Sequence, residues 1–291
     1  MKLGFIGLGR MGQEIARRLT EHELVIYNRT RGKTMELAKI GAQVASSIAE
    51  ACEGREIVIT LLSDDVALSD VVLSSRGIRD SLPKGAIHLA MGTHGVHAIR
   101  STASAHEKAG QILVAAPVLG RPDVAAAGQV GIIAAGPANA VDRCQILFDK
   151  IGRRVFFAGS APEGAAAIKL ANSFVLGCAI EAMGEAFSLV RKHNVAAGVL
   201  YDVMTDGMFS SPAYKVYGRI IVDQDYDRIG FTTELGLKDI NLALAAGDTS
   251  RVPLPSANVV RDRLLGAIAH GDGERDWAIM AREQARSTDL E

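Results

Sequence analysis

The sequence predicts an α/β protein with two domains: an N-terminal doubly wound sheet, and an all-α C-terminal domain entered by a long interdomain helix. In the first half of the 291 residues, short β-branched runs alternate with amphipathic segments, which is the pattern of βαβ units and a parallel sheet. After Gly159 this strand pattern stops, and apolar residues recur at helical spacing. We therefore expect one domain over residues 1–160 and a second over residues 161–291.

Each expected strand of the first domain is a short apolar run bounded by turn residues. The expected strands are Lys2–Ile6, Glu23–Tyr27, Glu56–Leu61, Ala86–Ala90, Gln111–Ala115, Gln129–Ala135 and Arg154–Ala158. The helices expected between them are Met11–Thr20, Lys33–Ile40, Val66–Ser74, His97–Ala109 and Asn139–Ile151. Right-handed crossovers would wind these elements into one open sheet with helices on both faces.

The second domain begins with the longest helix. Pro162 is well placed for a first helical turn, and helical spacing continues to about Lys192, roughly 45 Å of helix at 1.5 Å per residue. Small residues such as Gly177 and Gly184 allow either tight packing within one subunit or close approach of another; we expect a homodimer or higher homo-oligomer. The helices expected after it are Ala196–Met204, Pro212–Val222, Thr233–Ala246, Ser256–Ala269 and Glu274–Ala285.

Composition argues against several classes of protein. Lys and Arg total 32 against 33 Asp and Glu, a net charge of -1, so we expect neither a nucleic-acid nor an anionic membrane partner. The three cysteines are widely spaced, and the histidines show no metal-ligand spacing, so neither a disulfide framework nor a metal site is expected. No basic segment precedes the first strand, and no run approaches about 18 uncharged apolar residues. A cytoplasmic protein is expected.

The clearest motif lies at the first strand-to-helix turn. It has the form GxGxxG and comprises Gly7, Leu8, Gly9, Arg10, Met11 and Gly12. In this Rossmann-type context the first glycine makes the tight turn, the second lets backbone approach a pyrophosphate, and the third lets helix and strand pack closely. The helix N-terminus then offers N–H groups to the anion. The motif therefore predicts a dinucleotide site.

The end of the second strand indicates which dinucleotide binds. NAD enzymes usually place an acidic residue there to bind the ribose 2′-OH, whereas this chain has Asn28, Arg29 and Thr30. A guanidinium pairs with a 2′-phosphate, and the two neutral neighbours do not repel it. NADP(H) is therefore expected in preference to NAD(H). Leu62, Ser63 and Thr93 follow later strands, at the edge where open sheets bind ligands.

The second domain adds a candidate for proton transfer. Lys169 is a cation on a segment otherwise rich in Ala, Ile and Leu, and Asn172 lies three residues on, so both share one helical face. Lys238 and Asp239 lie within a later helical pattern. By themselves these residues are more typical of solvated surface positions, because most lysines on helices are solvated.

Together, four motifs resemble the β-hydroxyacid dehydrogenases, which include 3-hydroxyisobutyrate dehydrogenase and the glyoxylate/succinic semialdehyde reductases. The resemblance covers essentially the whole chain. In order, the stretches similar to family motifs are 7–12 (GLGxMG), Ala115–Arg121 (DAPVSGG), Gly159–Lys169 with Asn172 (GxxGxGxxxxKxxN), and Lys238–Ala243 (KDxxLA).

The resemblance implies an NADPH-dependent enzyme that interconverts a small aldehyde or oxoacid, such as succinic semialdehyde or glyoxylate, and its hydroxy acid. It implies that Lys169 donates a proton to the carbonyl oxygen, that Asn172 orients the substrate, and that Asp239 holds the local hydrogen bonds. Positions implied at the nicotinamide end are Thr93 and Lys238. Positions implied to contact substrate are Leu119, Gly120, Arg121 and Phe231, the last as an apolar wall.

Departures from the family pattern leave two alternatives open. Leu119 replaces a serine and Arg121 a glycine of the substrate motif, Pro162 replaces a glycine, and Ser173 replaces a frequent asparagine. Loss of the serine hydroxyl favours an imine reductase of the same architecture, whereas Lys169 speaks against it, because imine reductases commonly carry Asp or Tyr there. The other alternative is a non-catalytic NADPH-binding sensor.

Overall fold

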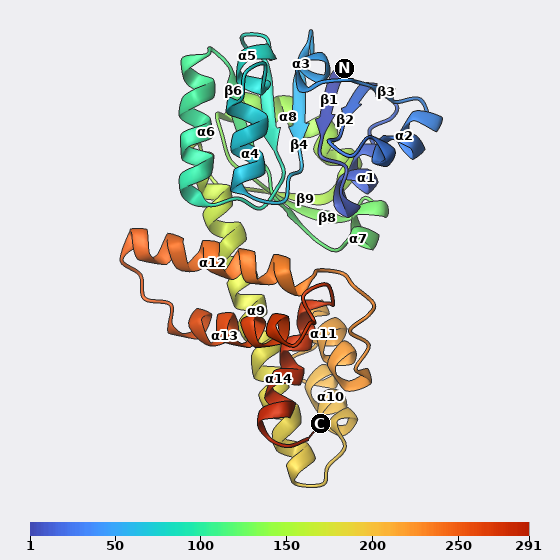
Figure 1. Ribbon diagram of the computed structural model, residues 1–291, viewed down its shortest axis with the longest axis vertical. Coiled ribbons are helices and arrows are strands. Elements are labelled where there is room, and N and C mark those ends of the chain that lie inside the picture. The colour runs from blue at the N-terminus through green and yellow to red at the C-terminus, as the bar shows by residue number, and fades with distance from the viewer. Residues whose placement is uncertain (291) are drawn as a thin grey trace. The chain divides into compact units, whose positions relative to one another are not determined.

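The computed structural model describes residues 1–290 and divides into two compact units, which meet in sequence between Lys169 and Leu170 (Figure 1). This division falls inside helix α9 (Glu163–Lys192), whereas the sequence places its boundary just before that helix. Glu291, the last residue of the expected second domain, lies outside the described residues.

A parallel sheet of six strands forms the centre of the first unit, in the order β3-β2-β1-β4-β5-β6. Its strands are β1 (Lys2–Ile6), β2 (Glu23–Tyr27), β3 (Gln43–Val44), β4 (Ile57–Thr60), β5 (Ile87–Ala90) and β6 (Ile112–Ala115). Strands β1 and β2 have the bounds that the sequence predicts, and β3 is the one that it misses. The predicted doubly wound parallel sheet is confirmed.

A second, three-stranded sheet corrects the expectation of a single sheet. It contains β7 (Val118–Leu119), β8 (Val130–Ala134) and β9 (Gly152–Phe157). Strand β8 pairs antiparallel with β7 and parallel with β9, and its following residue Ala135 forms only an isolated bridge to Ala115. Pairing partners this far apart in sequence leave no local pattern, so the division into two sheets was not predictable.

Helices cover both faces of the larger sheet (Figure 1). The helical elements of the first unit are α1 (Arg10–Arg17), the 3₁₀ turn η1 (Arg31–Thr34), α2 (Met35–Lys39), α3 (Ile48–Cys52), α4 (Asp65–Leu73), α5 (Ile78–Ser81), α6 (Val96–Lys108), α7 (Pro122–Ala126) and α8 (Ala138–Ile151). The sequence misses α3, α5 and α7, because helices of five residues or fewer are too short to show a helical period.

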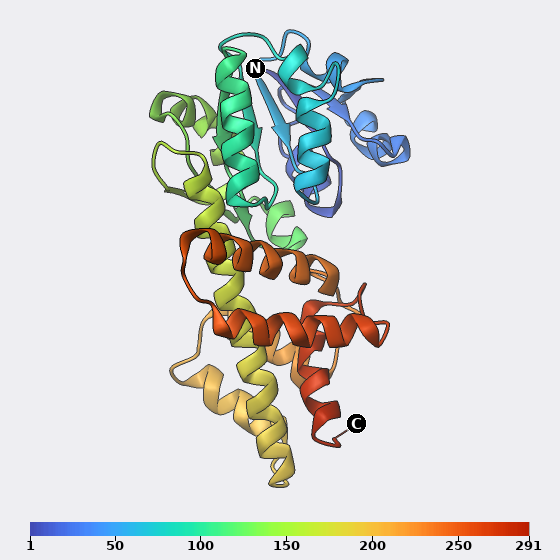
Figure 2. The ribbon, with the colours of Figure 1, turned by 60° about the vertical axis from the view of Figure 1, so that its left-hand side comes forward.

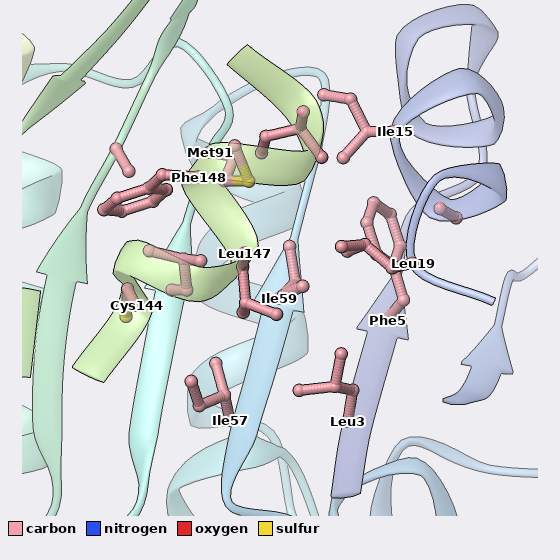
Figure 3. Close-up of a cluster of buried hydrophobic side chains, with 14 of the residues drawn as sticks. Leu3, Phe5, Ile15, Leu19, Ile57, Ile59, Met91, Cys144, Leu147 and Phe148 are labelled. Carbon is pink, nitrogen blue, oxygen red and sulfur yellow. The ribbon is translucent and has the colours of Figure 1, made fainter. Parts of the chain in front are cut away.

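Alternating strand residues supply the two apolar layers of this unit. Leu3 and Phe5 of β1 pack on one face, whereas Ile6 packs on the other. Figure 3 shows Phe5 beside Ile15 of the helix after β1 and beside Leu19, which lies just beyond the end of that helix. Because both faces are buried, these strands are almost continuously apolar, as the sequence pattern indicated.

A chain of buried polar side chains crosses the second of these layers. The Thr60 hydroxyl lies 2.9 Å from Nε2 of His88, whose Nδ1 lies 2.8 Å from Nε2 of His106. Nδ1 of His106 in turn lies 2.6 Å from the amide oxygen of Gln111. Burial lowers the pKa of both imidazoles, and the neighbouring His106 lowers that of His88 further. Both rings are therefore neutral in the folded protein at neutral pH.

We predict that this pair makes the protein less stable in mild acid. Below about pH 6.5 these histidines bind protons in the unfolded chain, whereas the buried rings of the folded protein stay neutral. The free energy of unfolding therefore falls by up to about 1.4 kcal/mol per pH unit for each ring. Urea unfolding should show a loss on the order of 2 kcal/mol between about pH 7.5 and about pH 5.5. The substitution His88→Gln should reduce this loss, whereas His97→Gln, at an exposed position, should not. An unchanged pH dependence in His88→Gln contradicts the prediction.

The second unit is helical, as expected. Besides the later part of α9 it contains α10 (Ala197–Asp206), α11 (Pro212–Asp223), α12 (Thr233–Ser250), α13 (Pro255–Ala269), the 3₁₀ turn η2 (Trp277–Ile279) and α14 (Met280–Ser287). Helices α12 and α13 lie side by side in both views (Figures 1 and 2). The helix expected from Glu274 starts later, because the buried Asp276 caps η2.

The small residues of α9 pack within this unit at two positions. A Cβ on Gly177 would lie 3.0 Å from the Val260 side chain, and one on Gly184 would lie 2.9 Å from Ala281. These glycines therefore allow α13 and α14 to pack closely against α9, which is the intrasubunit alternative left open by the sequence.

By length and composition α9 could also cross a membrane, but a core helix of a soluble protein passes the same test. Ile180 and Phe187 of α9 are buried in this unit's core.

Candidate functional site

The turn between β1 and α1 has the geometry that the glycine motif predicts. Gly7 has a φ of +102°, and a Cβ there would lie 2.4 Å from the Leu61 carbonyl oxygen. A Cβ on Gly12 would lie 2.1 Å from the Gly7 carbonyl oxygen, so only glycine fits there. At Gly9 a Cβ would meet no atom of the described residues within 4 Å. The backbone at Gly9 is thus open to a ligand, as pyrophosphate binding requires.

The N-terminus of α1 points its first-turn N–H groups into the same turn. Its N-cap residue is Gly9, which has no side chain to satisfy them. The Leu8 amide donates a hydrogen bond to Oδ1 of Asn28 at 2.8 Å, and Nδ2 of Asn28 donates to the Thr30 carbonyl at 2.9 Å. Asn28 therefore holds the glycine turn against the loop that follows β2. Arg29 and Thr30 of that loop are exposed, and so is Arg10, whereas Met11 is half-buried.

The remaining residues predicted to bind the cofactor in this unit follow β4 and β5. The parallel register pairs Ile6 with Thr60 and Thr60 with Ala90, so the loops after all three strands leave the same sheet edge. Leu62 and Thr93 on these loops are half-buried, and Ser63 is exposed. The Ser63 hydroxyl donates to the carboxylate of Asp64, which caps α4. The structure thus brings the predicted residues of four loops to one edge.

Sequence reasoning did not predict the contacts that join the last two loops. Asp65 accepts hydrogen bonds from the Gly95 amide at 3.0 and 3.2 Å, and Nδ1 of His94 lies 3.2 Å from one of its oxygens. His94 is only 1% exposed. Gly92 packs directly against this ring, because a Cβ there would lie 2.5 Å from its Nε2. An aspartate and a histidine 29 residues apart form no motif, so nothing in the sequence indicated this pair.

The predicted substrate-contacting stretch follows β6. The amide of Ala116, just beyond β6, donates a hydrogen bond to the Ala90 carbonyl oxygen at 2.7 Å. This stretch therefore leaves the sheet beside the end of β5. Leu119 is half-buried in β7, Gly120 is exposed with a φ of +152°, and Arg121 is half-buried at the N-cap of α7. An apolar side chain therefore occupies the position where the family motif has serine.

In the second unit, a buried polar cluster surrounds Asp239. The side chain of Asp239 is 1% exposed, and Nζ of Lys238 lies 3.0 Å from its Oδ1. The Ser173 hydroxyl donates to its Oδ2 at 3.0 Å, across 66 residues of sequence. Sequence reasoning noted Ser173 only as a departure from the family pattern. Asp239 therefore joins α12 to α9, a geometry suited to the hydrogen-bonding role predicted for it.

Lys169 and Asn172 lie on the same helix, α9, as Ser173. Lys169 is half-buried and precedes Ser173 by four residues, so their side chains share one face of the helix. Asn172 is exposed. An ammonium at this position is able to stabilise negative charge that develops on an oxygen and to donate a proton to it.

The predicted apolar wall, Phe231, lies just before α12. Its side chain is half-buried, and its ring centroid lies 5.2 Å from that of Trp277 at an interplanar angle of 82°. Trp277 is 1% exposed and belongs to the core of this unit. Part of the Phe231 ring therefore packs on a rigid core residue, and the rest remains accessible.

Two further observations limit the chemistry of the chain. No group of three or more His, Cys, Asp or Glu residues suited to a metal ion occurs among residues 1–290. Burial raises the pKa of the Cys52 and Cys144 thiols to about 12, so neither is a nucleophile near neutral pH.

Comparison with known proteins agrees with these features. Residues 2–159 match the model of the NAD-binding domain of 6-phosphogluconate dehydrogenase, and residues 164–283 match that of the NAD-binding region of NADP-dependent 3-hydroxyisobutyrate dehydrogenase. The uncharacterized oxidoreductase YfjR of Bacillus subtilis is 38% identical, covering 97% of this chain and 99% of its own. Glyoxylate/succinic semialdehyde reductase 1 of Arabidopsis thaliana is 30% identical and covers 96% of each chain.

Solved structures share the fold. The 3-hydroxyisobutyrate dehydrogenase of Mycobacterium tuberculosis superposes with a TM-score of 0.86 at 23% identity, covering 97% of this chain and 99% of its own. An imine reductase from Myxococcus stipitatus superposes with a TM-score of 0.65 at 18% identity, covering 97% and 99%. With both domain models matched in order and a full-length relative at 30% identity, the chain belongs to the β-hydroxyacid dehydrogenase family of NAD(P)-binding oxidoreductases, to which 3-hydroxyisobutyrate dehydrogenase belongs.

Proposed function

We propose that this chain is an NADPH-dependent reductase of a small aldehyde or oxoacid, of the succinic semialdehyde or glyoxylate kind, which it interconverts with the hydroxy acid. The observation that carries the proposal is the arrangement on α9: Lys169 shares a face with Ser173, whose hydroxyl is bound to the buried Asp239. Such a half-buried ammonium beside a fixed hydrogen-bonding cluster suits proton donation to a carbonyl oxygen.

The roles of the residues follow from the reaction. The reduced nicotinamide, when bound, supplies the hydride to the carbonyl carbon. Lys169 stabilises the negative charge that develops on the carbonyl oxygen and donates a proton to it. Asn172 orients the substrate, and Asp239 restrains the hydrogen bonds around Ser173 and Lys238. Leu119, Gly120, Arg121 and Phe231 are assigned to the substrate pocket.

The cofactor assignment rests on the first unit. The open backbone at Gly9 and the N-terminus of α1 suit a pyrophosphate, and the exposed Arg29 suits a 2′-phosphate. Asn28 joins its own loop to the glycine turn, so it would hold the Arg29 loop beside the turn that would bind the pyrophosphate. Leu62, Ser63 and Thr93 lie on neighbouring loops of the same edge and are assigned to the rest of the cofactor.

The second candidate function is imine reduction. Leu119 favours it, because an apolar residue at the family's serine position removes a hydroxyl that would bind a substrate carboxylate. Lys169 favours the carbonyl reductase, because a cationic donor suits a developing alkoxide better than a developing amine. Arg121, in the same stretch, is assigned to bind a substrate carboxylate through a charge-assisted pair.

The test is a substrate panel followed by NADPH absorbance. We expect turnover of succinic semialdehyde and glyoxylate and none of a cyclic imine such as 2-methyl-1-pyrroline. Because a hydrogen bond to a charged group contributes about 1.5–3 kcal/mol, NADH should give a kcat/KM lower by about 10- to 100-fold. Arg29→Ala should remove most of that preference, whereas Arg17→Ala, an exposed arginine at the other end of α1, should leave it unchanged. Turnover of the imine alone favours the rival, and equal use of NADH contradicts the cofactor assignment.

We also propose that the chain works as a cytoplasmic homo-oligomer. Free cysteines at all three positions suit a reducing compartment. Sedimentation velocity of the purified protein measures the subunit count directly.

A further inference from the structure

The segment that carries Phe231 has no regular secondary structure of its own. It connects α11 with α12, and of its residues only Thr232 forms a β-bridge, with Asp276. The direction in which a loop side chain points depends on what holds its backbone. The contacts of Gly230 and Phe231 therefore decide where the Phe231 ring lies.

Asp276 supplies the main restraint on this loop. Its side chain is fully buried, and its Oδ2 accepts hydrogen bonds from the Gly230 amide at 2.8 Å and the Phe231 amide at 3.3 Å. Its Oδ1 accepts from the Ala278 amide at 3.1 Å and so caps η2. One carboxylate thus joins the loop to a segment about 46 residues later in the chain.

Trp277 completes the restraint. Its backbone amide donates to the Phe231 carbonyl at 2.9 Å, and its ring packs edge-on against the Phe231 ring. Both backbone polar groups of Phe231 and one side of its ring are therefore held by consecutive residues. A buried carboxylate is costly unless several donors satisfy it, and here the donors include the backbone of a predicted substrate-contacting residue.

We propose that Asp276 is a positioning residue for substrate specificity: it holds Phe231 as a fixed apolar wall and thereby favours carbonyl substrates that have methylene groups between carbonyl and carboxylate. The inference rests on the proposed function, in which Phe231 contacts the substrate. Each buried methylene contributes about fourfold to binding, so a wall that contacts the two methylenes of succinic semialdehyde discriminates it from glyoxylate by about tenfold. Glyoxylate has no methylene for the wall to contact.

The test compares both aldehydes in Asp276→Asn and Asp276→Ser. Asparagine keeps the size and loses the charge; serine still caps η2 but is too short to reach the Gly230 and Phe231 amides. We expect either variant to raise the KM for succinic semialdehyde by about five- to tenfold, with kcat within about twofold and the KM for glyoxylate unchanged. Binding of NADPH, measured by its fluorescence, should also be unchanged.

The matched control is Asp272→Asn. Asp272 is buried in the same segment, but its carboxylate pairs with Arg275 at 3.5 Å and Arg286 at 3.4 Å. This variant should lower the melting temperature without changing the ratio of the two KM values. A purely structural role of Asp276 would give the same result as this control and would overturn the proposal, as would failure of both Asp276 variants to fold.

Phe231→Ala separates this inference from the proposed function. If Phe231→Ala abolishes the preference for succinic semialdehyde and the Asp276 variants keep it, the inference alone is wrong. If Phe231→Ala also keeps the preference, Phe231 does not contact the substrate, and the pocket assignment is wrong together with the inference.

Discussion

Lys169→Ala is expected to lower kcat by about 10³-fold or more, because it removes both the proton donor and the positive charge at the developing alkoxide. The dissociation constant of NADPH should stay within about threefold of the wild-type value, since the residues assigned to the pyrophosphate and 2′-phosphate are untouched. Steady-state kinetics with succinic semialdehyde and fluorescence titration with NADPH measure the two quantities. With 4-deuterated NADPH, the variant should show a larger isotope effect, because the chemical step becomes rate-limiting.

Two further variants define the role of Lys169. Lys169→Arg keeps a positive charge, but a guanidinium does not release its proton, so kcat should stay far below the wild-type value. Lys192→Ala removes an exposed lysine at the end of the same helix and should leave kcat unchanged. Wild-type turnover in Lys169→Ala would show that the proposed mechanism is wrong.

Arg263→Met is expected to give the largest loss of stability, about 3–5 kcal/mol. Nε of Arg263 donates to Oε1 of Glu181 at 2.7 Å, and the Glu181 side chain is 6% exposed. A second hydrogen bond joins Arg263 to Gln284. Burial raises the pKa of Glu181, and Arg263 counteracts this, so its removal leaves a buried carboxylate without its partner charge. Urea unfolding at neutral pH measures the loss.

The pH dependence and a double variant identify the cause. Protonation neutralises the unpaired carboxylate, so the stability deficit of Arg263→Met should shrink as the pH falls from 7 toward about 5. Removing both charges with Glu181→Leu and Arg263→Met should recover most of the loss. Arg261→Met, on the same helix with a 42% exposed side chain, should cost no more than about 0.5 kcal/mol. A deficit that is independent of pH, or that persists in the double variant, contradicts an uncompensated charge as its cause.

Local steric and periodic rules explain what could be predicted. Gly7 is required by its positive φ and Gly12 by its contact with the Gly7 carbonyl, both within a single strand-turn-helix unit, so the dinucleotide turn was visible in the sequence. Strands β1 and β2 were likewise predictable because each is a short, nearly continuous apolar run, and helix α9 because helical spacing of apolar residues extends over its length. The short β3 was missed because two residues show no period.

The candidate site was predictable only in part. Lys169 and the Asn28–Thr30 loop were identified from residue type and position in the motifs. The bonds that restrain such residues were not: Ser173 to Asp239 spans 66 residues, and Asp276 to Gly230 spans 46. The same holds for His88 and His106, whose neutral state follows from burial that a sequence does not display.

The sequence by itself therefore determined the alternation of the longer strands and helices and the cofactor turn, because these depend on neighbours close in the chain, and four motifs taken together indicated the family. Only the tertiary structure decided the partition into two sheets, the partners of Asp239 and Asp276, and the burial of Glu181. The physical reason is that strand pairing, desolvation and hydrogen bonds between distant segments depend on which groups meet after folding. Those contacts are determined by how whole layers of strands and helices pack, and they cannot be identified from any single stretch of residues.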